Sequence, residues 1–196
     1  MPRIQPLERR ELPEFEPVFK GMDDSLGYVP NSFFTIGRDP GILKAVGGLM
    51  DAVWYPSTVT EPVRRLVTFA YSWFAGSPYS AAHCACGAVE LGLALEKIQS
   101  IEAYEHSPVY SAAERVLLRL CHHAARIPSA VTDADFNDLR QHFSEREAVF
   151  ITGLIATMAF LNKWNEIAQT KLEALPMTWA SENLPGFEAM MKGRPS

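Results

Sequence analysis

The chain has 196 residues, of which 47% are hydrophobic, and its formal net charge is −5. This length suits one domain, and the apolar content is sufficient for a core without disulfides or metals. The acidic balance argues against a basic nucleic-acid-binding surface, and no run of about 18 apolar residues predicts a membrane span. We therefore expect neither a nucleic-acid partner nor a membrane partner.

The segment from Met1 to Pro6 lacks the apolar stretch of a secretory signal. Three cysteines, Cys84, Cys86 and Cys121, do not make the disulfide framework of a small secreted domain. Both observations favour a cytoplasmic, thiol-reducing location.

Apolar residues at helical spacing, separated by Pro and Gly breaks, predict helices along most of the chain. No alternating β pattern is present. The sequence therefore predicts one all-α domain over residues 1–176, followed by an irregular tail over 177–196. The expected helices cover residues 11–26, 31–36, 40–54, 60–74, 78–91, 94–105, 112–126, 133–142 and 145–174.

Helix starts are marked by residues that can cap free backbone N–H groups. Asn31 and Thr60 are candidate N-caps, and a loop is expected at 56–58. Three capping boxes or close variants are also present, at Ser111-x-x-Glu114, Thr132-x-x-Asp135 and Ser144-x-x-Glu147.

One nine-residue stretch, Gly76 to Cys84, carries the most chemical information. Cysteines at positions 77 and 80 would make a Cys-x-x-Cys pair at a helix N-terminus, with His83 one turn further on. That arrangement lowers the pKa of one thiol and provides a second thiol to resolve it. The chain instead has Ser77 and Ser80, so the frame of a redox site is present without its thiols.

Several motifs occur in a fixed order: Gly-Tyr-Val-Pro-Asn at 27–31, Asp-Pro at 39–40, the stretch from Arg64 through the serine turn, Gly92 with the helix after it, and Asn-Lys-Trp-Asn at 162–165. This order resembles the carboxymuconolactone decarboxylase and alkylhydroperoxidase AhpD superfamily, especially its uncharacterised peroxidase-related members. The resemblance covers about residues 20–173.

In the redox members of this family, a glutamate stands twelve residues before the Cys-x-x-Cys pair, and a histidine follows the pair. The glutamate and histidine relay protons while the cysteines cycle between thiol and disulfide. The resemblance places Arg65 at the glutamate position, Ser77 and Ser80 at the cysteine positions, and His83 or Cys84 at the histidine position. We therefore expect the thiol peroxidase chemistry of the family to be lost.

The resemblance also implies an AhpD-like helical bundle that assembles as a homo-oligomer. The apolar helix predicted at 145–174 and the aromatic-rich hairpin of 60–92 offer surface for that assembly. No cofactor is expected.

The remaining thiols allow two interpretations. Cys84 and Cys86 are two residues apart on a helix, so their side chains point about 200° apart and cannot form a disulfide. Cys84 follows Ser80 by four residues and faces the same side, which makes it a candidate reactive thiol beside His83. The alternative is that all three cysteines are small buried apolar side chains.

His83 and Ser80 share a helix face and are candidates for acid–base or nucleophilic roles, a packing role for His83 being the alternative. Ser77 either belongs to the same site or caps the following helix. A guanidinium cannot act as a base at neutral pH, but it binds anions near a helix N-terminus. The hypothesis is a pocket for a small carboxylate, formed by Arg65, Tyr79, Ser77, Ser80 and His83; the alternative for Arg65 is an ion pair on its own helix.

Two other groups of residues favour structural roles. The adjacent His122 and His123 point about 100° apart and lack further ligands at matching spacing, so no metal site is expected. The aromatic pairs Trp54-Tyr55 and Trp73-Phe74, with Trp164, are expected in the core or a subunit interface.

Three functions remain open at this point. The first is an AhpD-like, peroxidase-related protein that has lost thiol chemistry and keeps a small-molecule pocket. The second is a decarboxylase-like lyase on a small organic acid, with His83 as acid–base and Arg65 as the carboxylate anchor. The third is a structural or regulatory oligomer without chemistry.

Overall fold

The computed structural model describes residues 2–54 and 58–193, so Tyr55 and most of the predicted 56–58 loop lie outside the described residues. Within that part, helices are the only regular elements, and the all-α prediction is confirmed. The α-helices are α1 (Glu16–Leu26), α2 (Asn31–Ile36), α3 (Pro40–Trp54), α4 (Glu61–Phe74), α5 (Pro78–Glu90), α6 (Leu95–Gln99), α7 (Ala112–Ala124), α8 (Asp133–Leu139), α9 (Glu145–Ala168), α10 (Ala174–Asn183) and α11 (Phe187–Lys192). Three short 3₁₀ helices cover Arg9–Glu11, Pro13–Phe15 and Ile101–Ala103.

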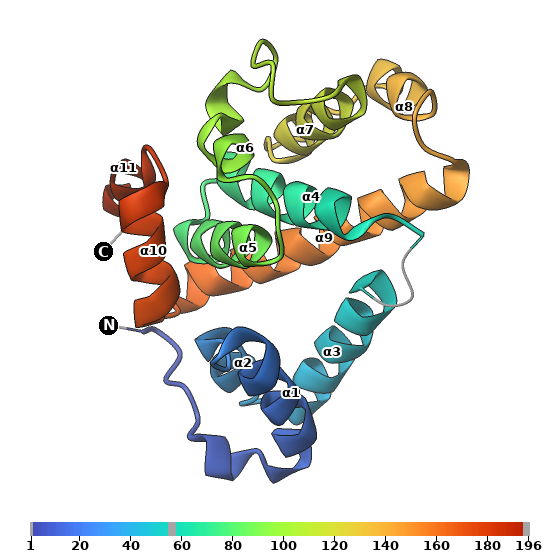
Figure 1. Ribbon diagram of the computed structural model, residues 1–196. Coiled ribbons are helices and arrows are strands. Elements are labelled where there is room, and N and C mark those ends of the chain that lie inside the picture. The colour runs from blue at the N-terminus through green and yellow to red at the C-terminus, as the bar shows by residue number, and fades with distance from the viewer. Residues whose placement is uncertain (1, 55–57, 194–196) are drawn as a thin grey trace.

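The helices form a larger body and a smaller N-terminal lobe (Figure 1). In the body, α4 packs against α5, α7 and α9, and α10 and α11 contact α5. The lobe consists of α1, α2 and α3, and it contacts the body through α9. The long helix α9 therefore joins both parts.

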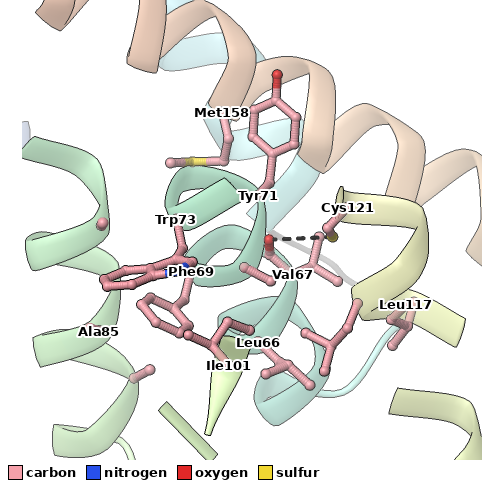
Figure 2. Close-up of a cluster of buried hydrophobic side chains, with 14 of the residues drawn as sticks. Leu66, Val67, Phe69, Tyr71, Trp73, Ala85, Ile101, Leu117, Cys121 and Met158 are labelled. Atoms are coloured by element: carbon pink, nitrogen blue, oxygen red, sulfur yellow. Dashed lines mark hydrogen bonds between the residues drawn. The ribbon is translucent and has the colours of Figure 1, made fainter. Parts of the chain in front are cut away.

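Each part has its own apolar cluster. The body cluster centres on α4, where Leu66, Val67 and Phe69 are fully buried (Figure 2). The lobe cluster contains Phe19 and Phe33 among its buried members, and Leu161 of α9 packs against both clusters. Burying one such side chain stabilises a fold by about 1.5–3 kcal/mol, so each cluster contributes to holding its own helices together.

The three capping boxes predicted from the sequence are all formed. In each one the Ser or Thr side chain accepts the N3 backbone N–H, and the N3 acidic side chain accepts the cap N–H. Thr60 occupies an N-cap position, but its side chain makes no capping bond. Asn31 is the first residue of α2 and Pro30 is the cap, so the prediction of an Asn31 cap is wrong.

The structure corrects two predictions near the C-terminus. Helix α9 ends at Ala168 because Gln169 adopts a left-handed conformation with φ of 51°, and its N–H bonds the Asn165 carbonyl. The segment after residue 176 is not irregular: it forms most of α10 and all of α11. Their apolar side chains join the body cluster, with Phe187 only 1% exposed, and that burial explains the helical order.

Two further predicted helices are shorter than expected. The segment 94–105 divides into α6 and a 3₁₀ turn, and residues 9–15 form 3₁₀ turns before α1 begins. Pro13 and Pro17 stand near the starts of these elements, where a missing N–H costs no helical bond.

Three large apolar side chains of α9, Val149, Phe160 and Ile167, are exposed. They lie on the helix that the sequence assigned to self-association, and the homo-oligomer stays a prediction. Among the residues that the structure describes, no helix has the length and apolar character to cross a membrane.

Candidate active site

A cavity of about 690 Å³ lies where the N-terminal lobe meets the body. Its size suits a small molecule. Helices α1, α3 and α9 supply most of the apolar part of its wall, including Val18, Met22, Met50, Trp54, Leu154, Met158 and Leu161.

His83, in the second turn of α5, lines this cavity. Its Nε2 atom lies 2.6 Å from Oε2 of Glu173, the N-cap residue of α10. Both side chains are largely buried, with exposed fractions of 14% and 12%. An ionised carboxylate only accepts hydrogen bonds, so Nε2 carries the proton of this contact; in the neutral imidazole Nδ1 is then the acceptor.

Tyr28 forms a hydrogen bond with the second ring nitrogen of His83. Its hydroxyl lies 2.7 Å from Nδ1, and the two ring centroids are 5.4 Å apart. Tyr28 follows the turn at Gly27, where φ is 76°, a left-handed conformation that favours glycine. Because Tyr28 also lines the cavity, a chain of hydrogen bonds runs from Glu173 through His83 to the cavity wall.

The other carboxylate oxygen of Glu173 accepts two hydrogen bonds. Tyr79 donates its hydroxyl proton to Oε1 at 2.9 Å, and the backbone N–H of Asn31 donates to the same atom. The Tyr79 oxygen in turn accepts the Ser32 backbone N–H at 3.2 Å. Glu173 is thus held by donors from α2 and α5, which fixes it against His83.

The pKa values of Glu173, Tyr28 and Tyr79 are shifted in different directions. Burial raises the pKa of Glu173, but the His83 hydrogen bond and charge and the Asn31 amide outweigh it, so the pKa lies below its usual value. Burial and the Glu173 charge both raise the pKa of Tyr28 and that of Tyr79. At neutral pH the groups bonded around His83 and Glu173 are therefore one carboxylate, that of Glu173, and two neutral phenols.

The two serines of the motif are placed differently from each other. Ser77 is fully buried, is not among the cavity-lining residues, and its hydroxyl has no hydrogen-bond partner. It stands at the N-cap position of α5, but the predicted side-chain cap is not formed. Ser80 lines the cavity, yet both nitrogens of His83 bond other residues, so the suggested Ser80–His83 contact is absent.

Arg65 lines the cavity and is held by its surroundings. Its Nε donates to Glu61 of the same helix at 2.7 Å, and its guanidinium carbon lies 5.0 Å from the centre of a Trp54 ring. A Cβ added at Gly87 would lie 4.0 Å from Nη1, so the guanidinium lies close to α5. The ion pair that the sequence offered as the alternative for Arg65 is formed.

All three cysteines are free thiols. Cys84 lines the cavity, and burial raises its pKa despite hydrogen bonds with Thr68 and Ser72. Burial and the charge of Glu90 raise the pKa of Cys86 to about 12, and burial also raises that of Cys121. At neutral pH none of these thiols is a ready nucleophile.

The histidines of α7 lie away from the cavity. His122 stacks on Phe74 with ring centroids 4.4 Å apart, and His123 lies 3.0 Å from Asp135. Over residues 2–54 and 58–193, no group of three His, Cys, Asp or Glu side chains is arranged to hold a metal ion.

The sequence located His83 but missed both of its partners. Tyr28 lies within a motif that indicated only the family, and Glu173 comes 90 residues after His83, inside a segment expected to be helical. An acidic residue between apolar neighbours, Leu172 and Ala174, was the one available signal for Glu173.

The helical bundle is similar to those of several known structures, among them AhpD-like proteins. No family model matches the chain, and no curated protein matches it either. A cysteine-to-alanine variant of the debrominase Bmp8 in complex with 2,3,4-tribromopyrrole is 29% identical, with a TM-score of 0.85 over 91% of this chain and 96% of that one.

Two further structures carry the family names. A protein of unknown function from Agrobacterium tumefaciens, described as a candidate antioxidant defence protein AhpD, is 25% identical over 70% of this chain and 94% of that one, with a TM-score of 0.66. An uncharacterised peroxidase-related protein from Ralstonia eutropha JMP134, with an alkylhydroperoxidase AhpD core, has a TM-score of 0.76 at 20% identity over 89% and 94%. The resemblance to the AhpD-like superfamily is confirmed.

Proposed function

We propose that this chain is an AhpD-like enzyme that binds a small, largely apolar molecule and transfers a proton to and from it. The observation that carries the proposal is the 2.6 Å pair of His83 with ionised Glu173 at the wall of the 690 Å³ cavity. A carboxylate that fixes the tautomer of an imidazole and stabilises its protonated form is a recurring acid–base device.

The charges around the cavity favour an uncharged ligand. Asp51, Glu61 and Glu90 line it along with Arg65, and Arg65 is paired with Glu61. The remaining carboxylates repel an anion. Much of the remaining wall is apolar, including Met22, Met50 and Leu154, which suits a hydrophobic ring or chain.

Thiol peroxidase chemistry is not part of the proposal. Ser77 and Ser80 supply no thiol pair, and Cys84 has a raised pKa and no second thiol in contact. With peroxide and an added dithiol we expect no turnover by the wild type, whereas the double substitution Ser77→Cys and Ser80→Cys should introduce some. Turnover by the wild type that requires Cys84 would contradict the proposal.

A suitable probe is 2,3,4-tribromopyrrole, the molecule bound by the Bmp8 variant. It has one ring C–H, whose exchange for deuterium in D₂O needs only proton transfer and is followed by proton NMR. We expect the wild type to accelerate the exchange above buffer, and His83→Gln to lose about 10²–10⁴-fold of that rate. Equal rates for the wild type, His83→Gln and buffer would refute the proposal and favour the non-catalytic oligomer.

A decarboxylase-like lyase is the second candidate, because Arg65 and His83 line the same cavity. In that case Arg65 would hold the carboxylate of a small organic acid. A thermal-shift series with small carboxylates on the wild type and Arg65→Ala decides between the two: stabilisation of the wild type alone favours the lyase, and equal responses leave the uncharged ligand.

A further inference from the structure

We propose that Tyr28, and not His83, is the residue that exchanges a proton with the bound molecule. His83 and Glu173 then act behind it, as the pair that positions the phenol and holds the transferred proton. This inference rests on the proposed proton-transfer function and names the residue through which it operates.

The inference rests on the fact that both ring nitrogens of His83 already have hydrogen-bond partners. Nε2 of His83 is engaged by Glu173 at 2.6 Å, and Nδ1 is engaged by the Tyr28 hydroxyl at 2.7 Å. A molecule in the cavity could reach either nitrogen only by displacing one of these partners. Without such a displacement, a bound molecule can exchange a proton with the His83–Glu173 pair only through the Tyr28 hydroxyl.

The Tyr28 hydroxyl is suited to that contact. Among the described residues its one hydrogen-bond partner is His83, and a phenol oxygen both donates and accepts. While its proton points to Nδ1, the oxygen can still accept from a ligand. Tyr79, by contrast, donates to Glu173 and accepts from Ser32, so its oxygen is already used in both directions.

The proton transfer balances without any oxidant or reductant. As the bond between the ligand and its proton breaks, that proton binds the Tyr28 oxygen, and the original Tyr28 proton moves to Nδ1. The imidazolium so formed holds a proton on each nitrogen beside the Glu173 carboxylate. Tyr28 is a neutral phenol before and after the step, and the reverse sequence returns a proton to the ligand.

The need for a coupled transfer follows from the burial of the phenol. Burial and the Glu173 charge raise the pKa of Tyr28, so a free phenolate does not form at neutral pH. Passing its proton to His83 in the same step avoids that charged state. The arrangement resembles a nucleophile–histidine–acid triad in which a tyrosine takes the outer position.

The test is Tyr28→Phe, which removes one oxygen and leaves the ring in place. We expect the deuterium exchange of 2,3,4-tribromopyrrole to fall by about 10²-fold or more, while the Kd of the probe changes less than threefold. The matched control is Tyr110→Phe, which also removes a buried phenol hydrogen bond, to the Lys97 carbonyl, on residues outside the cavity wall. It should exchange within twofold of wild type.

A second variant separates chemistry from packing. Replacement of Tyr28 by 3-fluorotyrosine keeps the hydroxyl and lowers the intrinsic pKa of the phenol, so the pH profile of exchange should move if Tyr28 transfers the proton. Wild-type exchange by Tyr28→Phe, with loss in His83→Gln, would overturn the role of Tyr28 and leave the proposed function standing. Absence of exchange in the wild type would instead remove both.

Discussion

Two histidine–carboxylate pairs in this molecule make similar contacts and differ in what surrounds them. His83 and Glu173 meet at 2.6 Å on the wall of a cavity, and His123 and Asp135 meet at 3.0 Å between α7 and α8. The side chain of His123 is 31% exposed, whereas that of His83 is 14% exposed. The contact alone does not mark a functional site.

The two pairs differ in the other hydrogen bonds that their carboxylate and imidazole groups make. Asp135 also accepts the backbone N–H and hydroxyl of Thr132, at 2.8 and 2.9 Å, and lies 3.3 Å from Arg119. These partners close a helix N-terminus. Glu173 instead holds a histidine whose other nitrogen leads to a cavity-lining phenol. One pair stabilises local structure, and the other is arranged for proton transfer.

The largest expected effect separates the two carboxylates by activity. Glu173→Gln removes the charge that stabilises the imidazolium, so deuterium exchange of the probe should fall by about 10²–10⁴-fold. Asp135→Asn should stay within twofold of the wild type, because its helices do not line the cavity. NMR exchange rates on both variants check this, and a comparable loss in both would erase the distinction.

The second effect is on stability, and here the substitution of Asp135 is the damaging one. Asp135 is 4% exposed and satisfies several donors, so Asp135→Asn should lower the free energy of unfolding by about 2–3 kcal/mol. The control is Asp138→Asn, which removes a 43% exposed partner of the same Arg119 and should cost less than about 1 kcal/mol. Urea unfolding measures both. Equal losses would show that burial does not set the difference.

The third prediction concerns pH. Burial raises the pKa of Asp135, but the hydrogen bonds from His123 and Thr132 lower it by more. The net result is a pKa of about 2, below the usual 3.8. A lowered pKa in the folded state stabilises the fold above the unfolded value. Unfolding free energy should therefore fall as pH decreases from about 4 towards 2, and this part of the dependence should be missing in Asp135→Asn. Superimposable pH profiles would contradict the assignment.

The smallest effect isolates the helix cap within the same cluster. Thr132→Ala removes the side chain that accepts the Asp135 N–H, and loss of such a cap costs about 1 kcal/mol. The exchange rate should not change. Chemical unfolding provides the measurement, and a loss as large as that of Asp135→Asn would mean that the cap, rather than the buried carboxylate, dominates.

Local signals in the sequence predicted local features well. Ser111, Thr132 and Ser144 each open a helix with the expected box, since a cap depends on residues three positions apart. His83 was found because it belongs to a short motif. Pro78 likewise stands in the first turn of α5, as its fixed φ favours.

The rest of the site depends on contacts between distant segments. Glu173 is positioned by the left-handed turn at Gln169, which ends α9, and by Asn31 and Tyr79, which no local pattern connects to it. The hydroxyl of Ser77 is fully buried without a hydrogen-bond partner, a property that depends on tertiary structure. Sequence periodicity carries no information on either.

The hydrogen bond that the Asn31 backbone N–H donates to Glu173 has a consequence for the integrity of the whole molecule. It joins the start of α2, in the lobe, to the start of α10, in the body, and Tyr28 crosses the same junction to His83. The relay therefore exists only while two separately packed clusters are docked. Any event that lifts the lobe disconnects the proton path and opens the cavity together, so occupancy of the site and closure of the fold are thermodynamically linked.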